Sequence, residues 1–518
     1  MKHENVLIFD TTLRDGLQPV ERNIFPYERL DIARNLAAMG VDIIEAGFPC
    51  SSAGNSRSVE LIAQEVGTKD GPVIAGLSRA NVSDIQAAAK AVEEAYKPRI
   101  HTFIATSDIH IEHKFGKDRD WVIEQTDRSV REARKYVDDV QFSLEDFGRS
   151  DPDFSYQVVR QAIAAGAGTI NLPDTVGYMM PEEYGSRIRD IIERARGDGY
   201  DAVFAVHTHN DLGLATANTL AGLQAGARQA EVAVNGIGER AGNSSLEEIV
   251  AVLRTRPIDD RDGVRLDTEV DTSYMGQVSS QVASYTDMQV QPNKAVIGKN
   301  AFAHSSGIHQ HGFLRERETY EIMKPEDYGM SSYVGQSAQS GRAGHKDRFD
   351  RIGVAFDSEE DFHAASARYT DIADSVRKTD DADFIRAVTG DEEVPVHYQL
   401  ATYHPVIESS SGEESLVGVV VKLYEGDTMH KAFEEGNGQV DAAVTAIKGI
   451  IGREYTIQDF HVGAGGAGSD ASGGAEVVVT KNGWEVTGHG QSTDIVKSGI
   501  QAYIDGCNRL RYIDEYFA

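Results

Sequence analysis

The stretch "AVFAVHTH", residues 202–209, decides the fold class of this chain. It begins as a continuous apolar run, which is expected of a strand buried on both faces in a parallel sheet. The run ends in polar residues, at the carboxyl end of the strand. Similar runs recur at intervals of roughly 30 residues, the length of a strand–helix repeat. They cover residues 6–10, 41–48, 72–78, 99–106, 138–145, 168–174 and 230–236.

Helical patterns separate these runs, as in "YERLDIARNLAAMG" (27–40), where apolar residues lie three and four positions apart. Eight repeats within about 250 residues predict an α/β fold with a (β/α)8 TIM barrel over residues 1–275. A doubly wound open sheet is the alternative, because periodicity alone cannot show that a sheet closes.

The rest of the chain has a different composition. Residues 276–390 are helical and charged, and we expect them to form helical linker subdomains. Residues 391–518 return to strand patterns, with helical stretches at 439–452 and 493–509, which predicts a small α+β domain. A chain of 518 residues is long enough for two or three domains.

The formal net charge of −31 makes nucleic acids and anionic membranes poor partners. The acidic residues are scattered, which is typical of a well-solvated surface; adaptation to high salt is the sharper interpretation. The chain has no apolar run of membrane-spanning length and no signal-peptide pattern. Its two cysteines are too few for a disulfide framework. We therefore expect a cytoplasmic protein with buried thiols.

Four polar side chains fall at the carboxyl ends of predicted strands. His207 and His209 lie two residues apart on one strand, so both point to the same face. In a closed barrel only the eighth strand separates them from Asp15 at the end of the first strand, and Asn243 follows the eighth. Taken alone, His207 and His209 could be ordinary polar residues and Asp15 an ordinary turn residue. Together they predict a site for Mn²⁺ or Mg²⁺, with Zn²⁺ and Co²⁺ as alternatives.

Ser244 and Ser245 are each followed three residues later by a glutamate, Glu247 and Glu248. This spacing predicts a capping box at the start of a helix.

The chain resembles the 2-isopropylmalate synthase family, of the bacterial type, over nearly its whole length. The wider group includes the homocitrate and citramalate synthases. The motifs that carry the resemblance are FDTTLRDG (9–16), EAGFP (45–49), HTFIATS (101–107), NLPDTVGY (171–178), VHTHNDLG (206–213), NGIGERAGN (235–243), FAHSSGIHQ (302–310) and GNGQVDA (436–442). The resemblance implies a metal-dependent Claisen-type condensation of acetyl-CoA with 3-methyl-2-oxobutanoate, giving 2-isopropylmalate and CoA.

The resemblance also implies roles for single residues. Arg14 would stabilise the negative charge that develops on the keto oxygen, and Thr175 would bind the substrate carboxylate. A helix N-cap is the alternative role for Thr175. Glu145 and His309 would together remove a proton from the acetyl group.

Four further residues complete this set. Tyr320 would assist thioester hydrolysis, and packing within a linker helix is its alternative role. His101, Ser143 and Leu77 would line the substrate pocket, with Leu77 against the isopropyl group.

The resemblance implies a homodimer or a dimer-based tetramer, in which the helical region bearing His309 reaches the barrel of the partner subunit. It implies leucine as an inhibitor, bound near the glycine-rich stretch at 461–480, and K⁺ is a further candidate activator. The effector-binding candidates in that stretch are Gly463, Gly465, Gly466 and Gly468. A plain surface hairpin is the alternative reading.

Two residues depart from the family pattern: Leu17 after the first motif and His311 after His309. "DGLQ" (15–18) is similar to hydroxymethylglutaryl-CoA lyase, but that enzyme lacks the C-terminal domain. Two other functions stay open on sequence grounds. One is a citramalate synthase using pyruvate, and the other is a non-catalytic amino-acid sensor.

Overall fold

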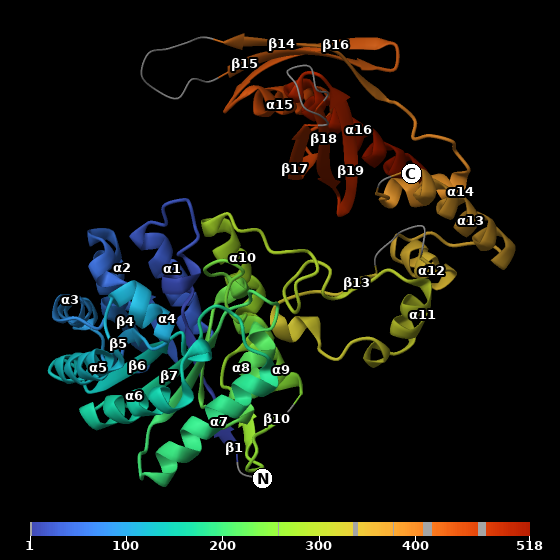
Figure 1. Ribbon diagram of the computed structural model, residues 1–518. Coiled ribbons are helices and arrows are strands. Elements are labelled where there is room, and N and C mark those ends of the chain that lie inside the picture. Colours follow the sequence, from blue (N-terminus) through green and yellow to red (C-terminus); the bar gives the residue numbers. More distant parts are fainter. Residues whose placement is uncertain (1–2, 257, 335–339, 377, 408–416, 465–472) are drawn as a thin grey trace. The chain divides into compact units, whose positions relative to one another are not determined.

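A computed structural model describes residues 3–256, 258–334, 340–376, 378–407, 417–464 and 473–518 (Figure 1). The chain forms two compact units. The first unit comprises Met1–Ala303 and Glu321–Ser332, and the second comprises His304–Tyr320 and Tyr333–Ala518. Each unit is described by itself.

The first unit is built on a closed barrel of parallel strands, β2 to β9. Closure comes from pairing of the first and last of these strands, with Leu7 opposite Gln229 and Asp10 opposite Val232. The predicted TIM barrel is confirmed, and the alternative of an open sheet is wrong. The strands are β2 (Leu7–Asp10), β3 (Ile43–Gly47), β4 (Val73–Arg79), β5 (Pro98–Ala105), β6 (Asp139–Glu145), β7 (Thr169–Asp174), β8 (Val203–Thr208) and β9 (Gln229–Val232).

Helices cover the outside of the barrel and bury their apolar faces against it (Figure 1). They are α1 (Pro26–Ala38), α2 (Ala53–Glu65), α3 (Val82–Val92), α5 (Arg119–Ala133), α6 (Pro152–Ala165), α7 (Pro181–Gly197), α8 (Ala215–Gln224), α9 (Leu246–Thr255) and α10 (Met275–Thr286). The single turn α4 (Asp108–His110) follows β5 and has no buried residue. A small sheet of β1 (His3–Asn5), β11 (Arg265–Asp267) and β10 (Ile258–Asp259) adds to this unit. Each fully buried Val, Leu or Ile contributes about 1.5–3 kcal/mol, so this apolar interior stabilises the scaffold on which the site is built.

The ends of these helices follow from local sequence. In α6, the Asp151 side chain accepts a hydrogen bond from the backbone N–H of Phe154, and Pro152 occupies the first helical position. Gly166 ends the helix with φ 113°, a left-handed conformation that favours glycine.

The capping box predicted before α9 is wrong. Ser245 is the N-cap residue, but its hydroxyl donates to Glu247 Oε2 at 2.6 Å rather than capping the helix. Glu247 in turn accepts from the backbone N–H of Asn235 at 2.9 Å, which ties the helix to the loop that follows β9.

The second unit begins with helices α11 (Gly307–Arg315), α12 (Arg342–Arg351), α13 (Glu359–Ser375) and α14 (Asp381–Thr389). Two antiparallel sheets follow, each with its own helix. One sheet contains β14 (Tyr398–Ile407), β15 (Val417–Glu425) and β16 (Thr428–Gly436), with α15 (Gln439–Ile451). The other contains β17 (Thr456–Ala464), β18 (Gly473–Lys481) and β19 (Trp484–Ser492), with α16 (Ile495–Phe517).

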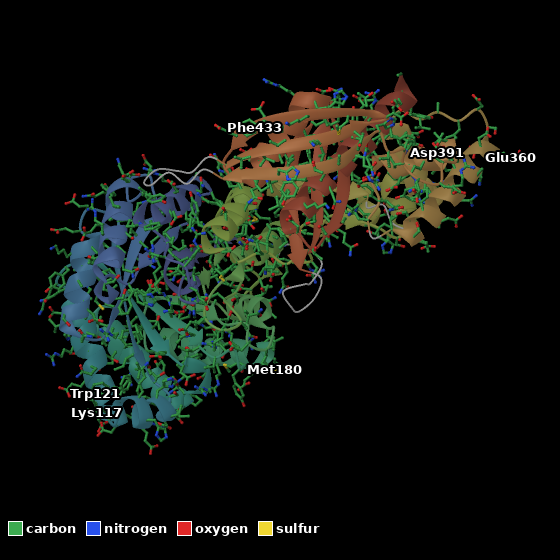
Figure 2. All side chains as sticks on the ribbon, turned by 90° about the horizontal axis from the view of Figure 1, so that it is seen from above. Lys117, Trp121, Met180, Glu360, Asp391 and Phe433 are labelled. Atoms are coloured by element: carbon green, nitrogen blue, oxygen red, sulfur yellow. The ribbon has the colours of Figure 1, made fainter. Side chains whose placement is uncertain are left out.

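These elements confirm the predicted C-terminal α+β domain, with β16 as a strand that the sequence patterns did not predict. Figure 2 labels Phe433 on β16 and Glu360 on α13 in this unit, and Trp121 on α5 in the barrel unit. In the part of the chain that the structure describes, we find no helix with the length and apolar character needed to cross a membrane.

The remaining pieces are short. The two-residue strands are β12 (Ala303–His304) and β13 (Tyr333–Val334). Single helical turns lie at Thr12–Gly16, Pro49–Ser51, Ile111–Phe115, Phe147–Arg149, Val234–Gly236, Thr272–Tyr274, Arg317–Thr319 and Pro325–Tyr328.

Candidate functional site

A π-helical turn, Thr12–Gly16, follows β2 and presents Arg14 and Asp15 at the barrel rim. The preceding residues hold this turn in place. Asp10 accepts hydrogen bonds from the backbone N–H and the hydroxyl of Thr12, at 3.0 and 2.8 Å. The Thr12 hydroxyl oxygen accepts from the backbone N–H of Val234 at 2.8 Å, which joins the turn to the end of β9. The Thr11 hydroxyl oxygen accepts from the backbone N–H of Asp15 at 3.3 Å, so both threonines of FDTTLRDG help to place Asp15.

Asp15, His207 and His209 converge, and all three are buried. Each offers one potential ligand atom, and these atoms lie within 4.8 Å of one another. Nε2 of His207 lies 3.1 Å from Nε2 of His209 and 3.9 Å from Asp15 Oδ2. Two ligands held at right angles about 2.1 Å from an ion would lie about 3 Å apart. The spacing of the two imidazoles therefore suits a divalent ion.

Asn243 lies beside this cluster, because an isolated antiparallel β-bridge joins its backbone to that of His209. Its Nδ2 donates to Asp15 Oδ1 at 3.1 Å and to the backbone oxygen of Ile237 at 3.0 Å. Its Oδ1 is buried and has no hydrogen-bond partner among the described residues. A buried amide oxygen without a partner is costly, and a cation would satisfy it.

Gly238 allows this close packing. It has φ 154°, and a Cβ placed there would lie 3.0 Å from Asn243 Cγ and 3.1 Å from Asp15 Oδ1. Any larger residue would therefore push the ligand side chains apart.

The electrostatics of the cluster also favour a cation. Burial raises the pKa of Asp15, but Arg14 and the two histidines outweigh it, and the net pKa lies below its usual range. Burial and the neighbouring His207 lower the pKa of His209 to about 3. The carboxylate is thus ionised and the His209 imidazole neutral near pH 7, which are the forms that bind metal ions. The residues present fit a divalent ion.

Arg14 is held by two carboxylates. Its Nε donates to Glu45 Oε2 at 2.5 Å, and its Nη1 forms an ion pair with Asp15. Glu45 is fully buried in the middle of β3, and its Oε1 also lies 2.6 Å from His101 Nδ1. The other ring nitrogen of His101 lies 2.6 Å from the Ser143 hydroxyl. One hydrogen-bond network therefore connects the Arg14 guanidinium at the rim to His101 and Ser143, two of the predicted pocket residues.

Thr175 lies after β7 and lines the same cavity. Its hydroxyl oxygen accepts from the backbone N–H of Asp146 at 2.9 Å, which leaves the hydroxyl proton available to a ligand. The alternative role as a helix N-cap is wrong, because α7 begins at Pro181 with Met180 as its N-cap.

Glu145, at the end of β6, is paired with a lysine. Lys114 Nζ donates to both carboxylate oxygens of Glu145, at 2.7 and 2.8 Å. Lys114 comes from the turn Ile111–Phe115 after β5. The carboxylate of Glu145, part of the proposed base, is therefore paired with the Lys114 ammonium group in the wall of the cavity.

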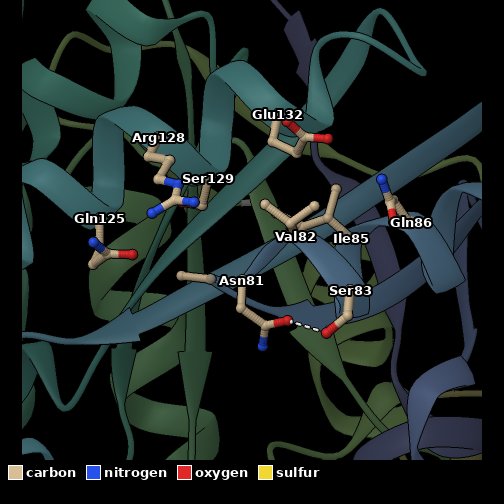
Figure 3. Close-up of a pocket in the computed structure, with 10 residues that line it drawn as sticks. Asn81, Val82, Ser83, Ile85, Gln86, Gln125, Arg128, Ser129 and Glu132 are labelled. Carbon is tan, nitrogen blue, oxygen red and sulfur yellow. Dashed lines mark hydrogen bonds between the residues drawn. The ribbon is translucent and has the colours of Figure 1, made fainter.

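The rim encloses a cavity of about 260 Å³. It brings together the predicted barrel residues Arg14, Asp15, Leu77, His101, Ser143, Glu145, Thr175, His207 and His209. A larger cavity, of about 420 Å³, lies on the outer surface between α3 and α5. Its wall consists of helix-surface side chains such as Asn81, which accepts from the Ser83 hydroxyl (Figure 3). We assign the chemistry to the smaller cavity because the buried ionisable groups meet there.

The other predicted residues belong to the second unit. His309 and Tyr320 are exposed, and their rings pack against each other with centroids 4.3 Å apart. Because the two units are described separately, their place relative to the rim stays a prediction. Gly463 is exposed in β17, opposite Gly474. Gly465, Gly466 and Gly468 lie outside the described residues.

Three residues at or below the rim were missed by the sequence analysis. Glu45 is a charged residue inside the apolar run of β3, so this interruption of the pattern could have revealed it. Glu231 interrupts the apolar run of β9, which is a weaker signal. Lys114 carries no signal, because a lysine in a turn is ordinary.

Known proteins resemble this chain over nearly its whole length. Residues 5–282 match the HMGL-like family, residues 296–377 the homocitrate synthase post-HMGL domain-like family, and residues 376–511 the LeuA allosteric (dimerisation) domain. The chain is 43% identical over 509 residues to the 2-isopropylmalate synthase of Nitrosomonas europaea, covering 98% of each chain. It is 44% identical to the enzyme of that name from Gloeobacter violaceus, covering 99% of this chain and 96% of the relative.

A third relative, the 2-isopropylmalate synthase of Carboxydothermus hydrogenoformans, is 45% identical over 515 residues, which is 98% of each chain. The similarity includes the barrel, the linker and the C-terminal domain together. On this similarity, the chain belongs to the 2-isopropylmalate synthase family.

Proposed function

We propose that this chain condenses acetyl-CoA with 3-methyl-2-oxobutanoate and hydrolyses the thioester, giving 2-isopropylmalate and CoA in leucine biosynthesis. The observation that carries the proposal is the buried convergence of Asp15, His207 and His209 beside Arg14. A 2-oxo acid can offer its keto oxygen and one carboxylate oxygen to a divalent ion at this site. Its keto oxygen would then also lie near the guanidinium of Arg14.

Asp15, His207, His209 and Asn243 would hold the ion, Mn²⁺ or Mg²⁺ first and Zn²⁺ or Co²⁺ as alternatives, with K⁺ as a further activator. When bound, such an ion supplies Lewis-acid polarisation of the keto group. Thr175 would donate its free hydroxyl proton to the substrate carboxylate, because its oxygen is already used by Asp146.

The first chemical step removes a proton from the acetyl methyl group. That proton is weakly acidic, so a positioned base is needed. We assign this step to His309 acting with Glu145. Lys114 keeps both oxygens of Glu145 paired, which fixes the orientation of that carboxylate.

The second step forms the carbon–carbon bond. The methyl carbon attacks the keto carbon, the carbonyl π bond breaks, and its electron pair moves to the oxygen. Arg14 would stabilise that charge, since it is held in place by Glu45 and Asp15 and costs little reorganisation. That oxygen then takes back the proton removed in the first step. Water attacks the thioester carbonyl, the C–S bond breaks, and the proton that the water loses goes to the departing CoA thiolate. Tyr320 would assist this hydrolysis.

Substrate choice would depend on the apolar wall of the cavity. Leu77 lies there, with His101 and Ser143 on the neighbouring strands. A few methylene groups separate 3-methyl-2-oxobutanoate from pyruvate, so discrimination on the order of 10–200-fold is expected. Higher kcat/KM on pyruvate would identify a citramalate synthase instead.

The test of the central proposal is release of the CoA thiol. The full-length protein is stripped with EDTA, and Mn²⁺, Mg²⁺, Zn²⁺ or Co²⁺ is added back separately. We expect thiol release that requires both substrates and a metal ion, and 2-isopropylmalate as the product by mass spectrometry. No release with any of these ions would overturn the proposal and favour a non-catalytic amino-acid sensor.

The second unit would bind leucine as a feedback inhibitor, near Gly463, Gly465, Gly466 and Gly468, in a homodimer or a dimer-based tetramer. The match of residues 376–511 to an allosteric dimerisation domain supports this. Calorimetric titration with leucine should give heat, and leucine should lower turnover. A flat titration with unchanged turnover would remove the regulatory proposal and leave an ordinary hairpin at this position.

A further inference from the structure

A column of buried polar side chains fills part of the barrel interior beneath the rim. Arg99 on β5 donates from Nη1 to Gln141 Oε1 at 3.1 Å and to Gln229 Oε1 at 2.9 Å. Gln141 on β6 then donates from Nε2 to Glu231 Oε1 at 2.5 Å. Gln141, Gln229 and Glu231 are at most 1% exposed. TIM-barrel interiors are normally packed with branched apolar side chains, so a polar column needs a reason.

The column ends at His207. Glu231 Oε2 lies 3.2 Å from His207 Nδ1. The pair does not meet the angular requirement of a hydrogen bond, and in the described chain neither atom has any other hydrogen-bond partner. One atom is an acceptor and the other a potential donor, so each is the partner that the other lacks. A small rotation of the imidazole would satisfy both.

This pairing determines which ring nitrogen of His207 carries the proton. A carboxylate oxygen can only accept, so the proton must sit on Nδ1. Nε2 then keeps its lone pair, on the side of Asp15 and His209. The His209 imidazole lacks this arrangement, because its Nδ1 is buried with no hydrogen-bond partner within the described ranges.

We propose that Glu231 is a positioning residue for His207: it accepts the Nδ1 proton and thereby directs the Nε2 lone pair into the cation site. Gln141 holds Glu231 in turn, through the carboxylate oxygen that does not face the histidine, and Arg99 holds Gln141. The inference rests on the proposed divalent-ion site but on no particular substrate. Carboxylate partners of metal-binding histidines are a general device for raising ligand basicity.

The test is the affinity of the full-length, EDTA-treated protein for Mn²⁺, measured from the free-ion EPR signal. Glu231→Gln keeps the shape and the contact with Gln141 but turns an amide N–H₂ toward His207 Nδ1. That change forces the proton onto Nε2. We expect Mn²⁺ binding about 10–100-fold weaker than in the wild type. Glu28→Gln is the control, because it neutralises another buried glutamate of this unit, on α1.

Unchanged Mn²⁺ affinity in Glu231→Gln would overturn the proposal. If that variant has a lower Tm than the wild type, Glu231→Asp decides, because it keeps the charge and withdraws the carboxylate from the imidazole. Weaker binding by Glu231→Asp at wild-type Tm supports positioning, and wild-type affinity overturns it. A wild-type protein that binds no Mn²⁺, Mg²⁺, Zn²⁺ or Co²⁺ would instead refute the metal site itself.

Discussion

The barrel rim and the first segment of the second unit, His304–Tyr320, both carry proposed catalytic residues, but the two regions hold them differently. At the rim, Asp15, His207 and Asn243 are 3 to 6% exposed and each contacts another member of the site. In the second unit, Tyr320 is 42% exposed, and its ring packs against His309 with the centroids 4.3 Å apart. Preorganised groups need a rigid shell around them, and the rim has one. His309 on α11 and Tyr320 after the turn Arg317–Thr319 lack such a shell, so we expect their proposed roles to depend on a further surface that covers them.

The largest effect is expected of Asp15→Asn, which tests whether the buried rim holds a metal ion. It removes the negative charge that balances the cation while keeping the side-chain shape. We expect turnover to fall on the order of 10³-fold or more, because the lost Lewis acid contributes several kcal/mol. Steady-state thiol release and metal content by mass spectrometry measure the effect. Asp84→Asn, which neutralises a buried carboxylate paired with Arg79, is the control. It should keep the turnover and the metal content of the wild type. Full activity of Asp15→Asn would refute the assignment of the ligand.

His309→Ala tests the exposed pair. Loss of a positioned base typically costs 10²- to 10⁴-fold, so we expect turnover to fall by about that factor. Binding of 3-methyl-2-oxobutanoate, measured by calorimetry, should be retained, because the rim is untouched. His311→Ala, two residues away on the same helix, is the matched control. Undiminished turnover of His309→Ala in the steady state would show that the base lies elsewhere.

Thr175→Val tests whether the Thr175 hydroxyl at the rim binds the substrate carboxylate. The hydrogen bond to a charged carboxylate contributes about 1.5–3 kcal/mol, so KM for the keto acid should rise about 10- to 150-fold. Thr175→Ser keeps the hydroxyl and its contact with Asp146, and it should bind nearly as the wild type does. Equal KM values for the valine and serine variants would mean that this hydroxyl does not touch the substrate.

The smallest effect concerns the stability of the second unit in acid. In the second unit, burial lowers the pKa of His345 to about 4, below the value of 6.5 for a free histidine. The folded state thus binds fewer protons than the unfolded state, and stability falls as pH drops from 6.5 toward 4. Between pH 7 and pH 5 this should cost about 2 kcal/mol of unfolding free energy.

The experiment uses the placement of the two tryptophans, Trp121 in the barrel unit and Trp484 in the second. With Trp121→Phe as the background, Trp484 fluorescence reports urea unfolding of the second unit. His345→Leu should flatten the change in its unfolding free energy between pH 7 and pH 5. The same slope with and without the histidine would contradict the prediction.

The sequence was most informative where burial is strongest. The barrel strands were predictable because they are buried and largely apolar, and the polar residues after β2 and at the end of β8 pointed to Asp15, His207 and His209 as candidates. Closure was not predictable, since only the pairing of Leu7 with Gln229 decides it. The strand β16 was missed because it lies at a sheet edge with a largely exposed, charged sequence, "TMHKAFEEG".

The supporting residues were harder to predict than the ligands. Glu231 lies in the apolar run of β9, and its purpose becomes visible only when β8 places His207 Nδ1 beside it. The pairing of Lys114 with Glu145 joins two different strand ends, 31 residues apart. Contacts of this kind depend on the register of neighbouring strands, which local composition does not determine.

The hydrogen bond between Asn243 and Asp15 spans 228 residues of sequence, and closure of the barrel depends on its last strand. A ribosome adds about 5–20 residues per second, so Asp15 waits on the order of 10–50 s before its partners exist. During that interval the growing protein has an ionised carboxylate and a guanidinium but no histidines to complete the centre. A newly made chain can therefore capture its metal ion only after more than 240 residues have left the ribosome.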